Sequence, residues 1–278
     1  MKINVFFSRV LTLILFGFLV VACSKDEAVN TETNSDTNLL LVEESKQASE
    51  ADLATDGIFQ MIETAYGEIE EDQGRNASLF PDCVTIIITS ENDVTFVTLD
   101  FGFGCELQSG AIVSGMVHIT YGPVQNGTRT INYSFENFVW NNKAVAGGGT
   151  IFRERNNAAG NPQSTIHLNL EISFLSGLII SIDGTRVREW VEGVGSGTWM
   201  DNVFHVTGNR TAVSNTGFTH YGIVTEVLRK EATCQFFVSG IIDITRNSTD
   251  AVLNFGDGEC DNLATLTVNG VDHIIVLD

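Results

Sequence analysis

The sequence predicts an all-β protein, a large antiparallel β-meander preceded by one N-terminal α-helix. The 278 residues include 26 glycines, only 3 prolines and many Val, Ile, Thr and Phe residues, a composition that suits strands joined by tight turns. A period-two alternation of apolar and polar residues also recurs from Pro81 onward, as expected for strands with one buried face. We expect the meander to close as a barrel or to fold over as two layers.

The alternation is clearest in residues 165–174. The apolar residues of this run are Ile166, Leu168, Leu170, Ile172 and Phe174. Turn signals such as Gln125-Asn126-Gly127 and Asn215-Thr216-Gly217 separate similar runs. They divide residues 76–278, the predicted β domain, into roughly ten to twelve consecutive strands.

The first 22 residues have the layout of a secretory signal peptide. Lys2 and Arg9 accompany an apolar run from Leu11 to Val21, which is too short to span a bilayer. Small residues then lead to Cys23, and this resembles the bacterial lipobox, in which signal peptidase II cleaves before a cysteine whose sulfur carries diacylglycerol. The resemblance implies a lipid anchor at Cys23, with further acyl chains such as palmitate for stable attachment. The alternative is an ordinary signal peptide that contains a cysteine.

Residues 23–48 are predicted to be an acidic, flexible tether. The segment 24–75 contains 14 acidic and 3 basic residues, and 28–48 is rich in Asn, Thr, Ser and Glu, which favours a solvated spacer. Ser24-Lys25-Asp26-Glu27 resembles the export signal of Bacteroidetes-type lipoproteins. It implies an outer-membrane location with exposure on the cell surface. The alternative is the start of an acidic linker.

Residues 49–75 are predicted to form an amphipathic helix. Its apolar stripe is Ile58, Ile62, Ala65 and Ile69, with helical spacing. Ser49 or Asp52 would cap its start, and Gly74 would end it. We expect one face to pack on the sheet. The polar face is acidic, which argues against a helix that lies on a membrane.

Four cysteines remain beside Cys23, and an even number in an exported chain predicts two disulfides. Cys83 with Cys105, and Cys234 with Cys260, each have a midpoint at or beside a predicted hairpin turn. Each bridge would then clamp the open end of its own hairpin, so we favour this pairing. The alternative joins Cys83 to Cys260 and Cys105 to Cys234, and would tie the first hairpin to the last.

Four phrases resemble those of a family of uncharacterised Bacteroidetes outer-membrane lipoproteins. They are LDFGFGC (99–105), TRVREWVEG (185–193), VTGNRT (206–211) and NFGDGECDNLATLTVNG (254–270). The resemblance covers nearly all of the β region and implies the lipid anchor and an all-β secreted domain. It implies no activity and no catalytic residues.

The motifs of common hydrolases are missing from the sequence. There is no Gly-x-Ser-x-Gly nucleophile elbow and no His-Glu-x-x-His, both of which place catalytic groups at a fixed spacing. A net charge of −20 disfavours nucleic acid as a partner. We therefore expect a protein that is not an enzyme and that meets the membrane through its N-terminal lipid.

Arg186, Arg188 and Trp190 are expected to share one strand face. If arginines of neighbouring strands join them, this row would form a floor for an anionic or sugar ligand. The alternative is a solvated face whose arginines pair with acids such as Glu154 and Glu189.

Asp257, Glu259 and Asp261 alternate in a turn and form an oxygen-rich cluster that could hold Ca²⁺. The alternative, a polar turn beside a disulfide, is favoured because no bidentate glutamate follows at EF-hand spacing. No other cofactor is expected.

The tryptophans Trp140, Trp190 and Trp199 could stack on sugar rings, although core or rim positions are commoner for this residue. We expect a lipid-anchored, non-catalytic binding or structural module for glycans or surface partners. The alternative is a carrier that holds a lipid or another apolar ligand in a β cavity.

Overall fold

A computed structural model of the chain describes residues 28–71, 78–196, 198–247 and 249–278. It contains one long helix, a short π-helical extension and 14 strands. The elements are α1 (Ala28–Tyr66), η1 (Gly67–Glu71), β1 (Thr85–Glu91), β2 (Val94–Asp100), β3 (Cys105–Glu106), β4 (Ile112–Tyr121), β5 (Thr128–Trp140), β6 (Lys143–Glu154), β7 (Gln163–Ser173), β8 (Ile179–Glu192), β9 (Val203–Ser214), β10 (Thr219–Glu231), β11 (Phe237–Arg246), β12 (Thr249–Asp257), β13 (Leu263–Val268) and β14 (Val271–Val276).

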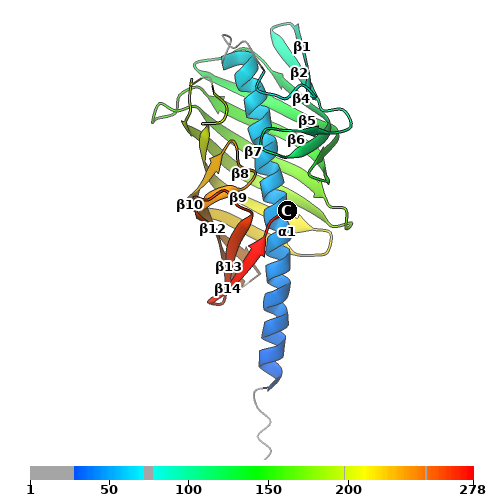
Figure 1. Ribbon diagram of the computed structural model, residues 1–278, viewed down its shortest axis with the longest axis vertical. Coiled ribbons are helices and arrows are strands. Elements are labelled where there is room, and N and C mark those ends of the chain that lie inside the picture. Colours follow the sequence, from blue (N-terminus) through cyan, green and yellow to red (C-terminus); the bar gives the residue numbers. More distant parts are fainter. Residues whose placement is uncertain (1–27, 72–77, 197, 248) are drawn as a thin grey trace, which may run out of the picture.

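The strands form a single antiparallel meander, as the sequence predicts. Each strand pairs with the next one along the chain, with one exception. The two-residue β3 pairs only with β4, and β2 pairs directly with β4. The first and last strands, β1 and β14, do not pair with each other, so the sheet is not closed into a barrel. One curved sheet runs from end to end and wraps around the helix (Figure 1).

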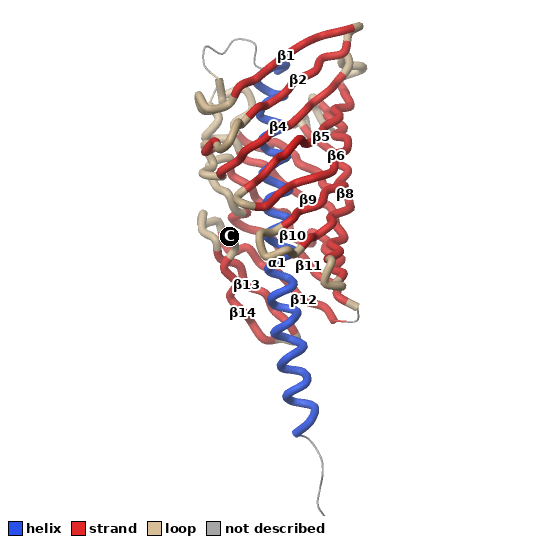
Figure 2. Tube along the Cα trace, turned by 90° about the vertical axis from the view of Figure 1, so that its right-hand side faces the viewer, coloured by secondary structure: helices blue, strands red, loops and turns tan. Residues whose placement is uncertain are grey.

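The helix α1 takes the place that a second layer would occupy. It lies along the concave face of the sheet, with strands on either side of it (Figure 2). Residues 48–62 are buried without exception, so the helix is enclosed around its whole circumference in this part. The curved sheet and α1 therefore form one core, and the sheet needs no second sheet to cover its apolar face.

The helix begins at Ala28, well before the predicted start at Ser49. The prediction of a flexible spacer is therefore wrong for residues 28–48. Leu41 is already buried in the core, and this contact favours helix despite the polar composition. Ser49 and Asp52 lie inside the helix and do not cap it; the Ser49 hydroxyl donates a hydrogen bond to the carbonyl oxygen of Ser45 at 2.7 Å.

The N-terminal part of α1 extends beyond the sheet (Figure 1). Among the described residues, no helix is both long enough and apolar enough to cross a membrane. The predicted signal peptide, Cys23, the export signal at Ser24–Glu27 and the helix stop at Gly74 lie outside the described residues.

The predicted apolar positions are confirmed in both kinds of element. Ile58, Ile62 and Ala65 have no exposed surface, and Ile69 packs against the same core from η1. In β7, the four residues that alternate from Ile166 to Ile172 are buried while the residues between them face outward or are only partly covered. Hydrophobic periodicity thus predicted which face of each element is buried.

Both predicted disulfides are confirmed. Cys83 is bonded to Cys105 with a Cα–Cα distance of 5.7 Å, and Cys234 is bonded to Cys260 with a Cα–Cα distance of 5.9 Å. The first bridge closes the β1–β2 hairpin, and the second closes the β11–β12 hairpin. Each hairpin is therefore held at its open end by a covalent bond.

Candidate functional site

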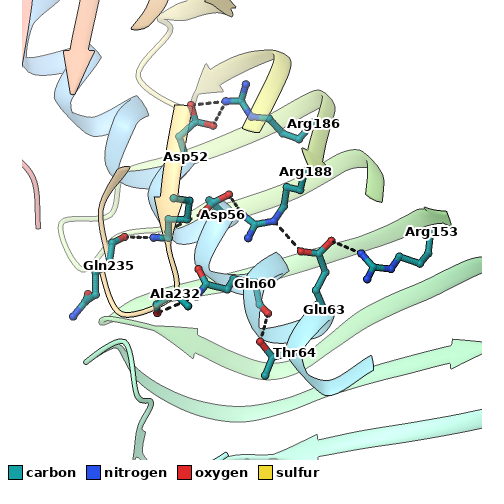
Figure 3. A network of polar contacts seen from close by, with 11 residues as sticks. Asp52, Asp56, Gln60, Glu63, Thr64, Arg153, Arg186, Arg188, Ala232 and Gln235 are labelled. Carbon is teal, nitrogen blue, oxygen red and sulfur yellow. Dashed lines mark hydrogen bonds and ion pairs between the residues drawn. The ribbon is translucent and has the colours of Figure 1, made fainter. Parts of the chain in front are cut away.

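Arg186 points from β8 into the concave side of the sheet, and a carboxylate of α1 meets it there. Its Nη2 atom lies 2.9 Å from both carboxylate oxygens of Asp52, and Nε of Arg210 on β9 lies 2.6 Å from Asp52 Oδ2 (Figure 3 shows Arg186 and Asp52). Burial raises the pKa of Asp52, but the two guanidinium groups outweigh it and hold this pKa below its usual value. The three side chains form a closed ionic triad.

Arg188, two residues further along β8, binds the next turns of the helix. It donates hydrogen bonds to Asp56 and, from Nε at 2.9 Å, to Glu63 (Figure 3). Glu63 also lies 3.9 Å from Nη1 of Arg153 on β6. Lys230 lies 3.8 Å from Asp56, and burial is the main reason that its pKa is lowered to about 8.

The charged row on β8 is therefore not an open floor for a ligand. Arg186 is 5% exposed and Arg188 is 1% exposed, because α1 covers them with its own carboxylates. Of the acids predicted to pair across strands, Glu189 accepts hydrogen bonds from Asn157 and Asn161, both at 2.8 Å, and Glu154 accepts one from Gln163 at 3.0 Å.

Trp190 continues the same row past the end of the ionic contacts and reaches a cavity. The cavity has a volume of about 210 Å³, between the C-terminal half of α1 and the loop after β8. Its aromatic wall consists of Trp190, Trp199 and Phe204. The indole of Trp190 stacks on Phe204 with a centroid distance of 6.0 Å, and its Nε1 donates to the carbonyl oxygen of Glu192 at 2.6 Å. We call this cavity the tryptophan pocket.

The polar side of the tryptophan pocket comes from residues far apart in the sequence. Glu63 and Arg153 line it as an ion pair, and Asn202 lies beside them. The Oδ1 atom of Asn202 and the Oε1 atom of Glu63 are buried without a hydrogen-bond partner. A buried acceptor without a donor carries an energetic penalty, which a ligand hydroxyl or amine relieves only if a neighbouring side chain moves to let it reach the atom.

A second, smaller cavity of about 30 Å³, here called the extension, lies next to the tryptophan pocket along α1. The two spaces share Thr64, Leu79 and Trp199, and Trp140 lies in the extension. A Cβ atom at Gly57 would lie 2.2 Å from Cζ2 of Trp140, so only glycine lets the helix approach the indole. All three tryptophans of the chain therefore line one or both of these two neighbouring cavities beside the helix.

Sequence reasoning found only part of this site. It singled out the three tryptophans and predicted that Trp190 shares a face with the arginines, but it missed Glu63 and Asn202. Glu63 looked like one more acid on a solvated helix face. The glycine-rich loop that starts at Gly193, between two tryptophans, was the one local signal that could have pointed to a pocket wall.

The candidate calcium ligands do not come together with other metal-binding side chains. Asp257, Glu259 and Asp261 are all exposed, and no group of three or more His, Cys, Asp and Glu side chains placed to hold a metal ion occurs in the described part of the chain. We therefore base no proposal on this turn.

Comparisons with protein-family models, with curated proteins and with solved structures gave no match. The resemblance to outer-membrane lipoproteins consequently stays a prediction from the sequence.

Proposed function

We propose that the protein is a lipid-anchored, exported outer-membrane lipoprotein that acts as a non-catalytic binding module and takes glycans in the tryptophan pocket. One observation carries the proposal: Trp190 and Trp199 wall a cavity whose other side is lined by the polar side chains of Glu63, Arg153 and Asn202. Sugars present both an apolar ring face and hydroxyl groups, and aromatic walls with a few polar groups match that combination.

The size of the pocket supports a ligand as small as one sugar ring. Its volume of about 210 Å³ is below the about 300–1,000 Å³ of drug-sized ligand sites. A longer glycan would place one unit in the tryptophan pocket and extend from its mouth into solvent. The protein would therefore recognise a single sugar unit, or one end of a glycan.

The position of the pocket along α1 suits presentation away from a membrane. The proposed anchor, Cys23, precedes the N-terminal end of the helix, and Glu63 in the pocket lies near its C-terminal end. With a rise of about 1.5 Å per residue, the helix separates Ala28 from Glu63 by about 50 Å. Such a helix would act as a stalk that holds the pocket at the far end of the domain.

The charged side chains in the pocket favour binding over catalysis. Glu63 is held by Arg188 and lies beside Arg153, so this carboxylate stabilises the fold. A general acid or base must instead exchange a proton with a bound substrate. Trp190 and Trp199 supply contact area and no reactive group.

A carrier for a lipid is the less supported alternative. The concave face, where a β cavity would hold an apolar ligand, is filled by α1. A lipid could enter only if the helix left its place and its buried ion pairs broke. Mass spectrometry of lipids that co-purify with the protein tests this alternative directly, and a stoichiometric lipid would favour it.

Affinity electrophoresis through gels that contain single polysaccharides tests the glycan proposal. The wild-type protein should be retarded by at least one polysaccharide, and Trp190→Ala and Trp199→Ala should each abolish the retardation because they remove a stacking wall. Tyr221→Ala is the matched control: Tyr221 is 42% exposed on β10 and is not in the pocket. Equal retardation of all four proteins would contradict the proposal.

Protease treatment of intact cells, with lysed cells as control, tests the proposed location. Loss of the domain from intact cells would support export to the cell surface through the signal at Ser24–Glu27. Protection until lysis would overturn surface exposure and place the domain in the periplasm.

A further inference from the structure

We infer that the tryptophan pocket selects neutral or amino sugars and rejects acidic ones. This inference rests on the proposed function and deepens it, since it names the chemical class of the glycan. Three features of the pocket carry it: the pairing of its cations, the chemistry of its free polar atoms, and the charge of the molecule around it.

The first feature is that the cations beside the pocket already have anionic partners within the protein. Arg153 lies beside Glu63, and Arg188 donates to Glu63 and to Asp56. Arg188 does not line the pocket. A uronic acid or a sulfated sugar would need a charged donor to replace the water that its anionic group loses, and the pocket offers it none.

The second feature is that the unpaired polar atoms in the pocket are acceptors. Oδ1 of Asn202 is buried without a hydrogen-bond partner, on a residue that is 9% exposed. Oε1 of Glu63 also lacks one. Both atoms are buried behind the pocket surface, so a ligand that displaces a neighbouring side chain and reaches them must bring a donor. Sugar hydroxyls and amino groups donate, whereas a carboxylate or a sulfate only accepts.

The third feature is the charge of the whole chain, which is −20. A field of that sign lowers the local concentration of polyanions and raises that of cationic ligands. An amino sugar would therefore gain both from this field and from the carboxylate of Glu63. Acidic polysaccharides would be disfavoured at long range and again inside the pocket.

The test is binding of the full chain in detergent micelles to a glycan array that groups neutral, amino, uronic-acid and sulfated oligosaccharides. We expect signal with neutral or amino sugars and none above background with the acidic groups. Signal with uronic-acid or sulfated sugars, alone or beside neutral ones, would overturn this inference and leave the proposed function standing. No binding to any glycan would overturn the proposed function, and the inference with it.

Two variants locate the selectivity in the pocket. Asn202→Ala should weaken binding of the best neutral glycan about tenfold, because one hydrogen bond is lost. Glu63→Gln should weaken an amino-sugar ligand more than a neutral one, because it removes the negative charge and keeps the shape. Unchanged affinities in both variants would overturn the inference.

Circular dichroism on each variant, with Tyr221→Ala alongside, shows whether the fold persists. If Glu63→Gln unfolds because Arg188 loses a partner, Asn202→Ala still decides the outcome. Loss of binding by Asn202→Ala with a native spectrum supports the inference, and wild-type binding contradicts it.

Discussion

The two sides of α1 are equally buried but are held by different chemistry. On one side Ile58, Phe59 and Ile62 pack into the apolar core formed with the first strands, where the rings of Phe59 and Tyr133 meet edge to face at 5.4 Å. On the other side the helix meets β8, β9 and β11 through ion pairs such as Asp52 with Arg186, beside apolar contacts of Leu41 and Leu53 with a second hydrophobic cluster. Burial alone therefore does not tell how a helix side is held.

The two sides of α1 differ in how strictly their contacts fix the position of the helix. Apolar contact is non-directional, and its strength follows the area removed from water. Ion pairs need particular atoms to meet, and a slide of the helix by one turn of about 5.4 Å would separate Asp52 and Asp56 from their arginines. We infer that the apolar side supplies most of the stability and that the ionic side sets the position of the helix along the sheet.

The largest effect should come from Asp52→Ala. The substitution leaves Arg186 and Arg210 buried without their counterion, and breaking a buried pair in this way typically costs about 3–5 kcal/mol. Urea unfolding measures the loss. Glu43→Ala is the control, because Glu43 is an exposed acid of the same helix and should change stability by less than about 0.5 kcal/mol. Equal stability of the two variants would show that the ionic side contributes nothing.

Ile62→Ala, on the apolar side of α1, should lower the free energy of unfolding by about as much as Asp52→Ala. Ile62 has no exposed surface, and replacement of a buried isoleucine by alanine costs about 2–5 kcal/mol through lost burial and the cavity left behind. The same urea titration applies. A loss under about 1 kcal/mol would mean that the core relaxes around the helix, and that the two sides differ less than the contacts indicate.

Removal of each disulfide in turn tests whether the two ends of the sheet depend equally on their disulfides for stability. The bridges span 22 and 26 residues, so removal of either by paired Cys→Ser substitutions should lower stability by about 3 kcal/mol. Thermal unfolding of the two double variants gives the comparison. A much larger loss for Cys83/Cys105 than for Cys234/Cys260 would show that the β1–β2 end depends more on its bridge.

We expect a smaller effect on stability from a change of pH, through the protonation of His220. Burial, with help from Arg210 and Arg246, lowers its pKa from 6.5 to about 3. The folded protein therefore keeps this imidazole neutral while the unfolded chain takes up a proton below about pH 6.5. Stability should fall as the pH falls from 6.5 toward 3, by up to about 1.4 kcal/mol per pH unit from this group.

His220→Gln should remove that slope, and urea unfolding at pH 7 and pH 5 measures it. His167→Gln is the matched control, since the side chain of His167 is exposed on β7. If His220→Gln and the wild type lose the same stability between the two pH values, then the histidine is not the source of the dependence.

The smallest loss of stability should follow replacement of the whole ionic triad. In Asp52→Leu with Arg186→Met and Arg210→Met, no charge is left unpaired, and such replacements are often neutral or stabilising by about 1–4 kcal/mol. If the ions set the position of the helix, hydrogen exchange of the α1 amides should speed up even though stability is kept. Unchanged exchange would contradict the positioning role.

The local features of this protein could be read from its sequence. Alternation along β7 and the stripe at Ile58 and Ile62 indicated the buried faces, because side-chain direction follows from the backbone geometry of each element. The disulfide pairing followed from two hairpins whose ends are close in the chain. The meander was likewise predictable, since consecutive strands with short turns pair with their neighbours.

The tertiary structure decided what the charges do and where the pocket lies. Asp52 and Arg186 are 134 positions apart, and an acid on a helix has the same local pattern whether it meets water or a buried guanidinium. The spacer before Ser49 is helical for a similar reason, because contacts of residues such as Leu41 with distant strands outweigh its polar composition. The tryptophan pocket arises only where the end of α1, β6 and the loop after β8 converge, and no local pattern encodes a meeting of distant segments.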